Sequence, residues 1–273
     1  MPAIRVMTFN VRGDHHPDGV NAWEQRADLN VRTIRKYAPD VIGFQECQQG
    51  NIAIYREQLP EYAYMPGNQT APDDPEHNPI FWRKERLQLL EAGEFWLNEA
   101  LERHTVGWDA HFGRTAHWTR LRLLDNERDF LLLNTHLDHE GETARHESSK
   151  LILRQLDSHA DLPLIVIGDF NCTPGTLAYD AFLQAGFTDT FLAAGNQDGN
   201  HSSTFHAFGG TKPSSTGKKP EALLEKSWRI DWILFKDRQD QLSLSACTII
   251  RDAEPPLYPS DHYPVLAELH YAE

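Results

Sequence analysis

Residues 163–174, which read PLIVIGDFNCTP, decide how this chain folds. Leu164 to Ile167 form an unbroken apolar and mostly β-branched run, which is typical of a strand covered on both faces. The run stops at Gly168, and Asp169 and Asn171 follow. Because residues two apart point to the same side of an extended backbone, we expect both side chains to leave the strand together at its carboxyl end, where α/β proteins usually keep their chemistry. A tight turn without chemistry would use the same residues, so the rest of the chain must decide.

The composition is that of one large globular domain. The chain has 273 residues, of which 40% are hydrophobic and 24% charged, so we expect a single domain over residues 1–273. It contains no apolar run long enough to span a membrane, and its amino terminus lacks the layout of a signal peptide. Cys47, Cys172 and Cys247 form no CxxC pair. We therefore expect free thiols in a cytoplasmic protein, with Cys47 and Cys172 serving as packing residues.

The net charge of −14 argues against one class of partner. Non-specific affinity for long duplex nucleic acid rests on Lys and Arg contacts to phosphates, so nucleic acid is possible but not favoured. A strongly acidic enzyme can still bind a phosphate ester when metal ions supply the local positive charge. Overall charge therefore leaves a phosphate site open.

The periodicity of the chain predicts alternating strands and helices in one continuous domain. Two successive strand-rich parts, each with its own helices, favour two sheets packed face to face with helices outside, although an ordinary doubly wound fold has the same periodicity. We expect loops at 67–78 and at 195–221, the second long and mobile, with residues 203–208 able to hold a ligand ring. Strands are expected at 4–11, 41–45, 78–83, 89–97, 115–124, 130–137, 164–167, 228–235, 242–250 and 263–271, and helices at 21–37, 48–59, 142–158 and 176–185, with a short segment at 187–191.

Polar residues recur where these strands begin or end. Each is individually compatible with a solvated or hydrogen-bonded structural role, but together they suit a metal site. Oxygen ligands such as Glu46, with Asn10 and Asp261 nearby, favour Mg²⁺ or Mn²⁺ over zinc. Asp169 suits a base that takes a proton from water, with Asn171 orienting that water. The full set is Asn10, Glu46, His136, Asp169, Asn171, Asp231, Asp261 and His262.

Six short motifs resemble, in order, those of the endonuclease/exonuclease/phosphatase superfamily, which includes DNase I-like nucleases and compact bacterial members near the CCR4-like branch. Each motif alone is weak, but all six in order along nearly the whole chain are a specific signal. The resemblance implies a four-layer α/β/β/α sandwich and a metal-dependent phosphoesterase activity. The motifs are Thr8 to Val11, Gln45-Glu46, Asn134 to Leu137, Gly168 to Asn171, Arg229 to Ile233 and Ser260 to Val265.

The resemblance also implies a role for each matched residue. Glu46 would be the main metal ligand beside Asn10, and Asp261 would complete the metal environment directly or through water. Asp169 would activate water that Asn171 holds, while His262, oriented by Asp231, would contact the scissile phosphate with help from His136. Arg114 lies where many members place a phosphate contact. One position departs from the pattern: some nucleases have a second acidic ligand where this chain has Arg12, and Asp14 is the next acidic residue.

Two function classes remain on this scaffold. The first is a divalent-metal phosphoesterase acting on a small phosphate ester, a nucleotide, a nucleic-acid end or, as in sphingomyelinases, a phospholipid. The second is a catalytically inactive binding module, which we would expect to have lost Glu46, Asp169 or His262. All three are present. The acidic surface favours a small substrate, the absence of an amphipathic or aromatic membrane hairpin disfavours lipid, and the oligomeric state is left open.

Overall fold

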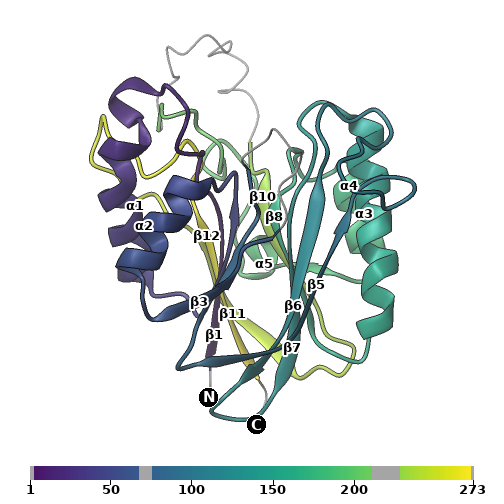
Figure 1. Ribbon diagram of the computed structural model, residues 1–273. Coiled ribbons are helices and arrows are strands. Elements are labelled where there is room, and N and C mark those ends of the chain that lie inside the picture. The colour runs from purple at the N-terminus through teal and green to yellow at the C-terminus, as the bar shows by residue number, and fades with distance from the viewer. Residues whose placement is uncertain (1–2, 68–75, 211–227, 272–273) are drawn as a thin grey trace.

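The computed structural model describes residues 3–67, 76–210 and 228–271 as two six-stranded mixed sheets packed face to face, with helices outside both (Figure 1). The predicted four-layer α/β/β/α sandwich is therefore confirmed. The first sheet has the order β11-β12-β1-β2-β4-β3, and the second β5-β6-β7-β8-β10-β9. The strands of the first sheet are β1 (Ala3–Asn10), β2 (Val41–Gln45), β3 (Tyr62–Met65), β4 (Ile80–Arg83), β11 (Leu242–Ile249) and β12 (Val265–Tyr271).

The second sheet carries the strand with which the sequence analysis began. Its members are β5 (Leu87–Trp96), β6 (Thr115–Leu123), β7 (Asp129–His136), β8 (Leu164–Asp169), β9 (Thr188–Asp189) and β10 (Asp231–Lys236). The helices are α1 (Trp23–Tyr37), α2 (Gln49–Gln58), α3 (Glu142–Leu156), α4 (Leu177–Gln184) and α5 (Thr190–Ala193), with short 3₁₀ turns at Gly19–Asn21 and Asp157–His159. In Figure 1, α1 and α2 cover the outer face of the first sheet, and α3 and α4 that of the second.

Side chains that point alternately to the two faces of the buried strands contribute to three separate hydrophobic cores. In β8, Ile165 and Ile167 face the core between the sheets, whereas Leu164 and Val166 face the core beneath α3 and α4. The same alternation in β1 sends Val6 between the sheets and neighbouring residues toward α1 and α2. A strand that is apolar on both faces is thus the consequence of lying between two hydrophobic layers.

A buried polar contact joins the two sheets. Asn134 of β7 donates to the backbone carbonyl of Phe44 at 2.8 Å, and its Oδ1 accepts from Gln45 Nε2 at 2.7 Å. These groups lie beside Gly43, where an added Cβ would be 2.6 Å from the Asn134 side chain and from Cδ1 of Ile167. Glycine at this position therefore permits the close approach of the sheets that the polar contact requires.

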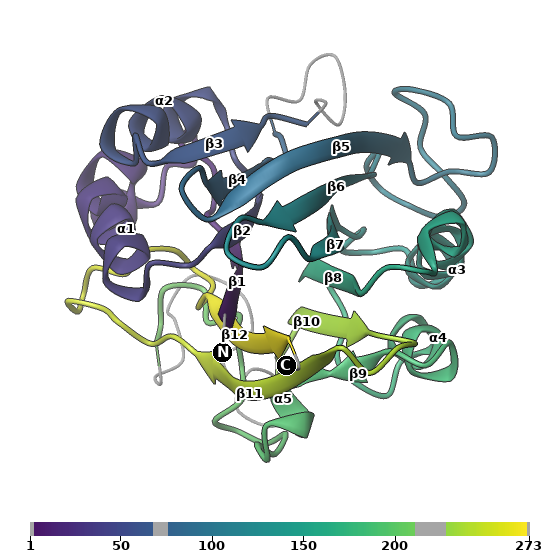
Figure 2. The same ribbon diagram turned by 90° about the horizontal axis from the view of Figure 1, so that it is seen from below.

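The structure corrects several expectations about the chain's course. The two sheets are not successive halves, because β11 and β12 return from the carboxyl-terminal part to pair with β1 (Figure 2). The short strand β3 was not predicted, and the expected segment 187–191 contains β9 and the start of α5. Strand β10 begins at Asp231 rather than at Trp228.

The expected mobile loop 195–221 is partly an ordered segment. Residues 211–227 and, in the other predicted loop, residues 68–75 lie outside the described part of the chain. Within 195–210, however, Thr204 and His206 are buried, and Thr204 accepts a backbone hydrogen bond from Tyr263 at 2.8 Å. Backbone pairing of Phe205 with His262 adds to this order. Residues 204–206 therefore make long-range contacts that were not predicted, because the polarity of the sequence hid their pairing with a distant segment, and the mobility of the loop stays a prediction.

Candidate active site

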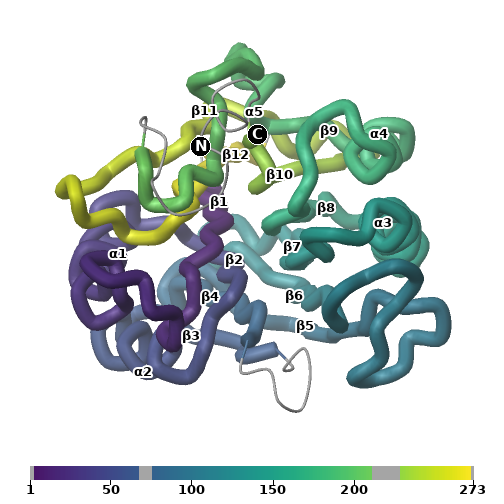
Figure 3. The backbone as a smooth tube through the Cα atoms, turned by 90° about the horizontal axis from the view of Figure 1, so that it is seen from above, coloured from purple at the N-terminus to yellow at the C-terminus, as the bar shows by residue number. Residues whose placement is uncertain are grey.

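The predicted strand-end residues meet at one end of the sandwich. Strands β1 and β2 are parallel, with Asn10 opposite Gln45, and β7 and β8 are parallel, with His136 opposite Asp169. The carboxyl ends of both pairs therefore lie on the same side, opposite the two chain termini (Figure 1), and Figure 3 looks down onto it. Four of the motifs thus converge because parallel strands bring their carboxyl ends together. The motifs with Asp231 and His262 join them because β10 and β12 run antiparallel to β8 and β1 and therefore begin at this end.

Asn10 connects the two sheets at this end. Its side-chain nitrogen donates to Glu46 Oε1 at 2.8 Å and to Asp169 Oδ2 at 2.9 Å. Its oxygen accepts the backbone N–H of Arg12 at 3.0 Å. Burial alone would raise the pKa of Glu46, but the hydrogen bond from Asn10 and the charge of His262 hold that pKa below its ordinary value. Glu46 therefore carries a negative charge at neutral pH.

His262 and Asp231 form a buried ion pair. Nδ1 of His262 lies 2.9 Å from Asp231 Oδ2, and Nε2 lies 3.7 Å from Asp169 Oδ2. Burial disfavours an imidazolium, but the charges of Asp231 and Asp169 outweigh burial and raise the pKa of His262 to about 10. The ring is therefore a cation at neutral pH, with Nε2–H directed toward Asp169.

Asp169, unlike His262, is shifted toward its neutral form. It is 1% exposed, and burial, together with the nearby charge of Asp231, raises its pKa to about 7. A carboxyl group of this pKa can accept a proton from water near neutral pH. Asp169 and Asn171 do reach the site together, but not by alternation along an extended strand. β8 ends at Asp169, and Asn171 takes a left-handed conformation with φ 50° and donates its backbone N–H to Asp169 Oδ1.

His136 is held by two neighbours. Arg114 Nη1 lies 3.0 Å from Nδ1 of the ring, and the Asn171 amide lies 3.0 Å from Nε2. A guanidinium group can only donate, so Nδ1 accepts and the ring proton is on Nε2, which lies 3.6 Å from Asp169 Oδ2. The Asn171 Nδ2 group also only donates, and its hydrogen bond goes to the Leu137 carbonyl at 3.0 Å, so it is a close neighbour of Nε2 and not its hydrogen-bond partner. Burial and the charge of Arg114 hold the pKa of His136 well below its ordinary value, so the ring is neutral. Arg114 contacts His136 in this structure, and its predicted contact with phosphate stays a prediction.

The remaining predicted positions lie around this centre. Asp261 is buried, which raises its pKa, and its Oδ2 lies 3.9 Å from Nε of Arg12. Arg12 also bonds Asp18 at 3.1 Å. The carboxylate of Asp14, the next acidic residue after Arg12, contacts His15 and faces Gly50.

The donor set fits a hard divalent cation. Ligand atoms of Glu46, His136 and Asp169 lie within 4.8 Å of one another, as do those of Asp169, Asp231 and His262. Within the described residues, Oδ1 of Asp231 is buried without a hydrogen-bond partner. Closely spaced carboxylates in a buried site repel one another, and a cation would offset that repulsion.

The contacts of Thr204 and Phe205 with the candidate site were not predicted from the sequence. Thr204 Oγ1 accepts the backbone N–H groups of Ile230 and Asp231 at 3.0 and 3.2 Å. The Phe205 ring lies 4.9 Å from the His262 ring. The only sequence signal was the aromatic and hydroxyl cluster at 203–208, which we expected to hold a ligand ring. Within it, His206 instead stacks on Tyr263 at 3.9 Å.

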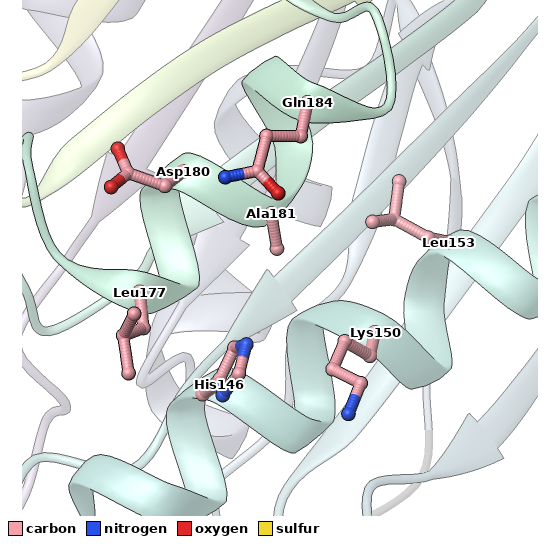
Figure 4. Close-up of a pocket in the computed structure, with 7 residues that line it drawn as sticks. All are labelled: His146, Lys150, Leu153, Leu177, Asp180, Ala181 and Gln184. Atoms are coloured by element: carbon pink, nitrogen blue, oxygen red, sulfur yellow. The ribbon is translucent and has the colours of Figure 1, made fainter.

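A hollow in the described part of the molecule lies away from the strand-end residues. It has a volume of about 440 Å³, lies between α3 and α4, and includes none of the strand-end residues (Figure 4). Its lining consists of His146, Lys150, Leu153, Leu177, Asp180, Ala181 and Gln184. The convergent polar groups, rather than this hollow, therefore mark the candidate site.

A family model for the endonuclease/exonuclease/phosphatase family matches residues 7–262, from the first sequence motif to His262. The chain belongs to this family. An endonuclease/exonuclease/phosphatase structure from Bacteroides vulgatus is 31% identical, with a TM-score of 0.85 and full coverage of both chains. A mannosyl-6-phosphatase of Bacteroides thetaiotaomicron is 27% identical, with a TM-score of 0.84, covering 98% of this chain and 100% of that one.

A curated relative is nocturnin of Drosophila melanogaster, which is 28% identical over 205 residues. The match covers 66% of this chain and 30% of nocturnin, so this chain spans less than a third of that protein. These similarities confirm the predicted family and its DNase I-like fold. No helix in the described residues is both long and apolar enough to cross a membrane.

Proposed function

We propose that this chain is a divalent-metal-dependent phosphoesterase that hydrolyses a small phosphate ester by in-line attack of water. One observation carries the proposal: a continuous set of contacts runs from Glu46 through Asn10 to Asp169, and on to His262 and Asp231. It joins a carboxylate suited to a metal, a carboxyl group suited to a base, and a buried imidazolium. All three are needed for this reaction, and they come from both sheets.

Each residue has a role in this proposal. Glu46, with Asn10 and Asp261, would hold Mg²⁺ or Mn²⁺, which when bound polarises the phosphoryl group and offsets its negative charge. Asp169 accepts the proton of the attacking water, and Asn171 orients that water. His262, kept cationic by Asp231, donates Nε2–H to a phosphoryl oxygen.

His136 and Arg114 would act on the other side of the reacting phosphate. The neutral His136 ring offers its Nε2 proton toward the phosphate or the leaving group, because Arg114 occupies Nδ1. Arg114 is 6% exposed, so it would contribute positive charge at close range with little screening by water. A direct contact between Arg114 and the phosphate remains part of this proposal.

The substrate class follows from charge and from the relatives. A net charge of −14 disfavours long nucleic acid, and a relative that is 27% identical over nearly the whole chain is named a mannosyl-6-phosphatase. A small phosphomonoester, such as a sugar phosphate or a nucleotide, is therefore favoured over a nucleic-acid end. Burial of Cys47, Cys172 and Cys247 as free thiols supports a reducing compartment such as the cytoplasm.

The test is a substrate screen with matched variants. Phosphomonoesters, phosphodiesters and short oligonucleotides are assayed with Mg²⁺ and with Mn²⁺, and again in EDTA. We expect hydrolysis of a phosphomonoester that EDTA abolishes, and a loss of roughly 10²-fold or more in Asp169→Asn and in His262→Ala. Full activity in EDTA on the best substrate would exclude the metal mechanism, and binding without turnover of any ester would favour an inactive binding module.

A further inference from the structure

A buried hydroxyl group lies where the two partners of the His262 ion pair meet. Thr204 is fully buried, and it contacts the segments that carry Asp231 and His262. We propose that Thr204 is a positioning residue that sets the spacing between Asp231 and His262. The proposal rests on the proposed function, because it assigns Thr204 to the reaction in which this ion pair acts.

In the described part of the chain, no strand pairing joins the two partners of the ion pair. Asp231 is the first residue of β10, which pairs with β8 and β9 in the second sheet. His262 lies three residues before β12, which pairs with β1 and β11 in the first sheet. Strand pairing therefore places each partner within its own sheet, and the distance between them depends on contacts that cross from one sheet to the other.

The backbone of Thr204 makes such a contact. Its N–H donates to the carbonyl of Trp228 at 3.0 Å, and its carbonyl accepts from the N–H of Tyr263 at 2.8 Å. One residue is thus bonded both to the segment that leads into β10 and to the residue that follows His262. The next residue extends this contact, because Phe205 forms a backbone bridge with His262. This backbone therefore links the two sheets beside the ion pair.

The hydroxyl group of Thr204 holds the backbone of the other partner. Oγ1 accepts the N–H groups of Ile230 and Asp231, at 3.0 and 3.2 Å, and donates to the Trp228 carbonyl at 3.2 Å. A hydroxyl group offers one donor and two acceptor positions, so these three bonds use its full capacity. Valine would fill nearly the same space but would leave two buried N–H groups without this acceptor.

The ion pair tolerates little movement. Nδ1 of His262 lies 2.9 Å from Asp231 Oδ2, so a shift of about 0.5 Å at either partner would move the contact outside the normal range of a hydrogen bond. The other oxygen of Asp231, Oδ1, has no hydrogen-bond partner within the described residues. The position of this carboxylate therefore depends on its backbone, which Thr204 holds, and on His262 itself. A displaced pair would turn Nε2–H of His262 away from the phosphoryl oxygen in the proposed reaction.

Three variants test the inference by kinetics. Thr204→Val removes the acceptor, and we expect kcat on the best substrate from the screen to fall roughly 10- to 100-fold with little change in KM, because misplaced groups affect the transition state more than the bound substrate. Thr204→Ser keeps the hydroxyl group and should restore most of the activity. Thr190→Val is the matched control, because Thr190 is also buried and donates to β10 at the Ile233 carbonyl, at 2.7 Å. This control should melt at a lower temperature than wild type but keep its kcat.

Nuclear magnetic resonance reports on the ion pair without turnover. In the metal-free wild type at neutral pH, the Nδ1–H of His262 should give a downfield, slowly exchanging proton signal, assigned by its absence from His262→Ala. Thr204→Val should lose this signal through faster exchange, whereas Thr204→Ser and Thr190→Val should retain it. If circular dichroism melts show that Thr204→Val does not fold, Thr204→Cys takes its place, because a thiol keeps only a weak acceptor.

The outcomes separate this inference from the proposed function. A folded Thr204→Val with the wild-type kcat, or with an unchanged Nδ1–H signal, would overturn the positioning role. A loss of kcat in Thr204→Ser or Thr190→Val equal to that in Thr204→Val would overturn it too, and so would a wild type without the signal. If no ester is hydrolysed, the phosphoesterase proposal fails, and the Nδ1–H signals of the variants alone decide whether Thr204 sets the spacing of the pair.

Discussion

Replacement of Asp231 by Asn tests whether a buried carboxylate sets the charge of His262. The substitution keeps the size of the side chain and an oxygen that can accept from Nδ1 at 2.9 Å, but removes the negative charge. In the variant, burial lowers the pKa of His262, and Asp169 and Asp261 are the remaining nearby negative charges that raise it. We expect the pKa of His262 to fall from about 10 to its ordinary value or below.

The size of the effect follows from the two protonation curves. With a pKa near 10, the wild-type ring is almost fully protonated at pH 8.5. A ring with the ordinary pKa of about 6.5 is only about 1% protonated there, so the variant should be roughly 100-fold slower. At about pH 6 most variant molecules still carry the imidazolium, and the deficit should shrink to a few-fold. The loss should therefore grow with pH.

Two assays check this prediction. Nuclear magnetic resonance of the metal-free chain should show that His262 does not titrate between pH 6 and 9 in wild type but does so in Asp231→Asn. The value of kcat/KM on the best substrate from the screen should then follow the calculated pH dependence. Asp129→Asn is the control, since it removes a carboxylate bound to Arg120 and Arg122, away from the site. A loss that is constant across pH, or a His262 pKa unchanged by the substitution, would refute the reasoning.

Three other predictions concern the surroundings of the site. Gly43→Ala should cost about 1–3 kcal/mol in free energy of unfolding, because its Cβ would lie 2.6 Å from the Asn134 side chain; denaturant titration measures this, and an unchanged midpoint would contradict it. Arg114→Met should raise the pKa of His136, although burial still holds it below its ordinary value, and should let the ring proton exchange between the nitrogens, whereas wild-type nitrogen shifts should report Nε2–H from pH 5 to 8. Burial holds the pKa of His206 well below its ordinary value, so the unfolded chain takes up a proton that the folded chain does not. Stability should therefore fall as the pH drops below about 6.5, by at most about 1.4 kcal/mol per pH unit, and melting of His206→Phe should depend less on pH than melting of wild type.

The sequence predicted which side chains lie together where a polar residue coincides with the end of a strand. Asn10, Glu46, His136 and Asp169 each mark such an end, and periodicity locates strand ends without knowledge of the pairing. Thr204 had no such marker, because it lies outside the strands and approaches the start of β10 only through the pairing of distant segments. Strand order depends on long-range packing, which local patterns do not contain.

The same limit explains the errors in the fold. Thr204 lies in a polar stretch that resembles a free loop, yet its backbone pairs with Trp228 and Tyr263. The local signal at Asn171 was right about the destination of the side chain and wrong about the conformation, because a left-handed residue was read as extended. Both cases show distant partners and turn geometry overriding local preference.

The return of β11 and β12 to the first sheet has a consequence for biosynthesis. His262 lies three residues before β12, which pairs with β1, so the first strand made must wait for one of the last before its second neighbour is present. On a growing chain, Asn10, Glu46 and Asp169 emerge long before the imidazolium that completes them. Under the proposed function, the nascent polypeptide would have no hydrolytic activity until its final segment leaves the ribosome, and a protein truncated ahead of Asp261 should lose catalysis and the closing of its first sheet in a single event.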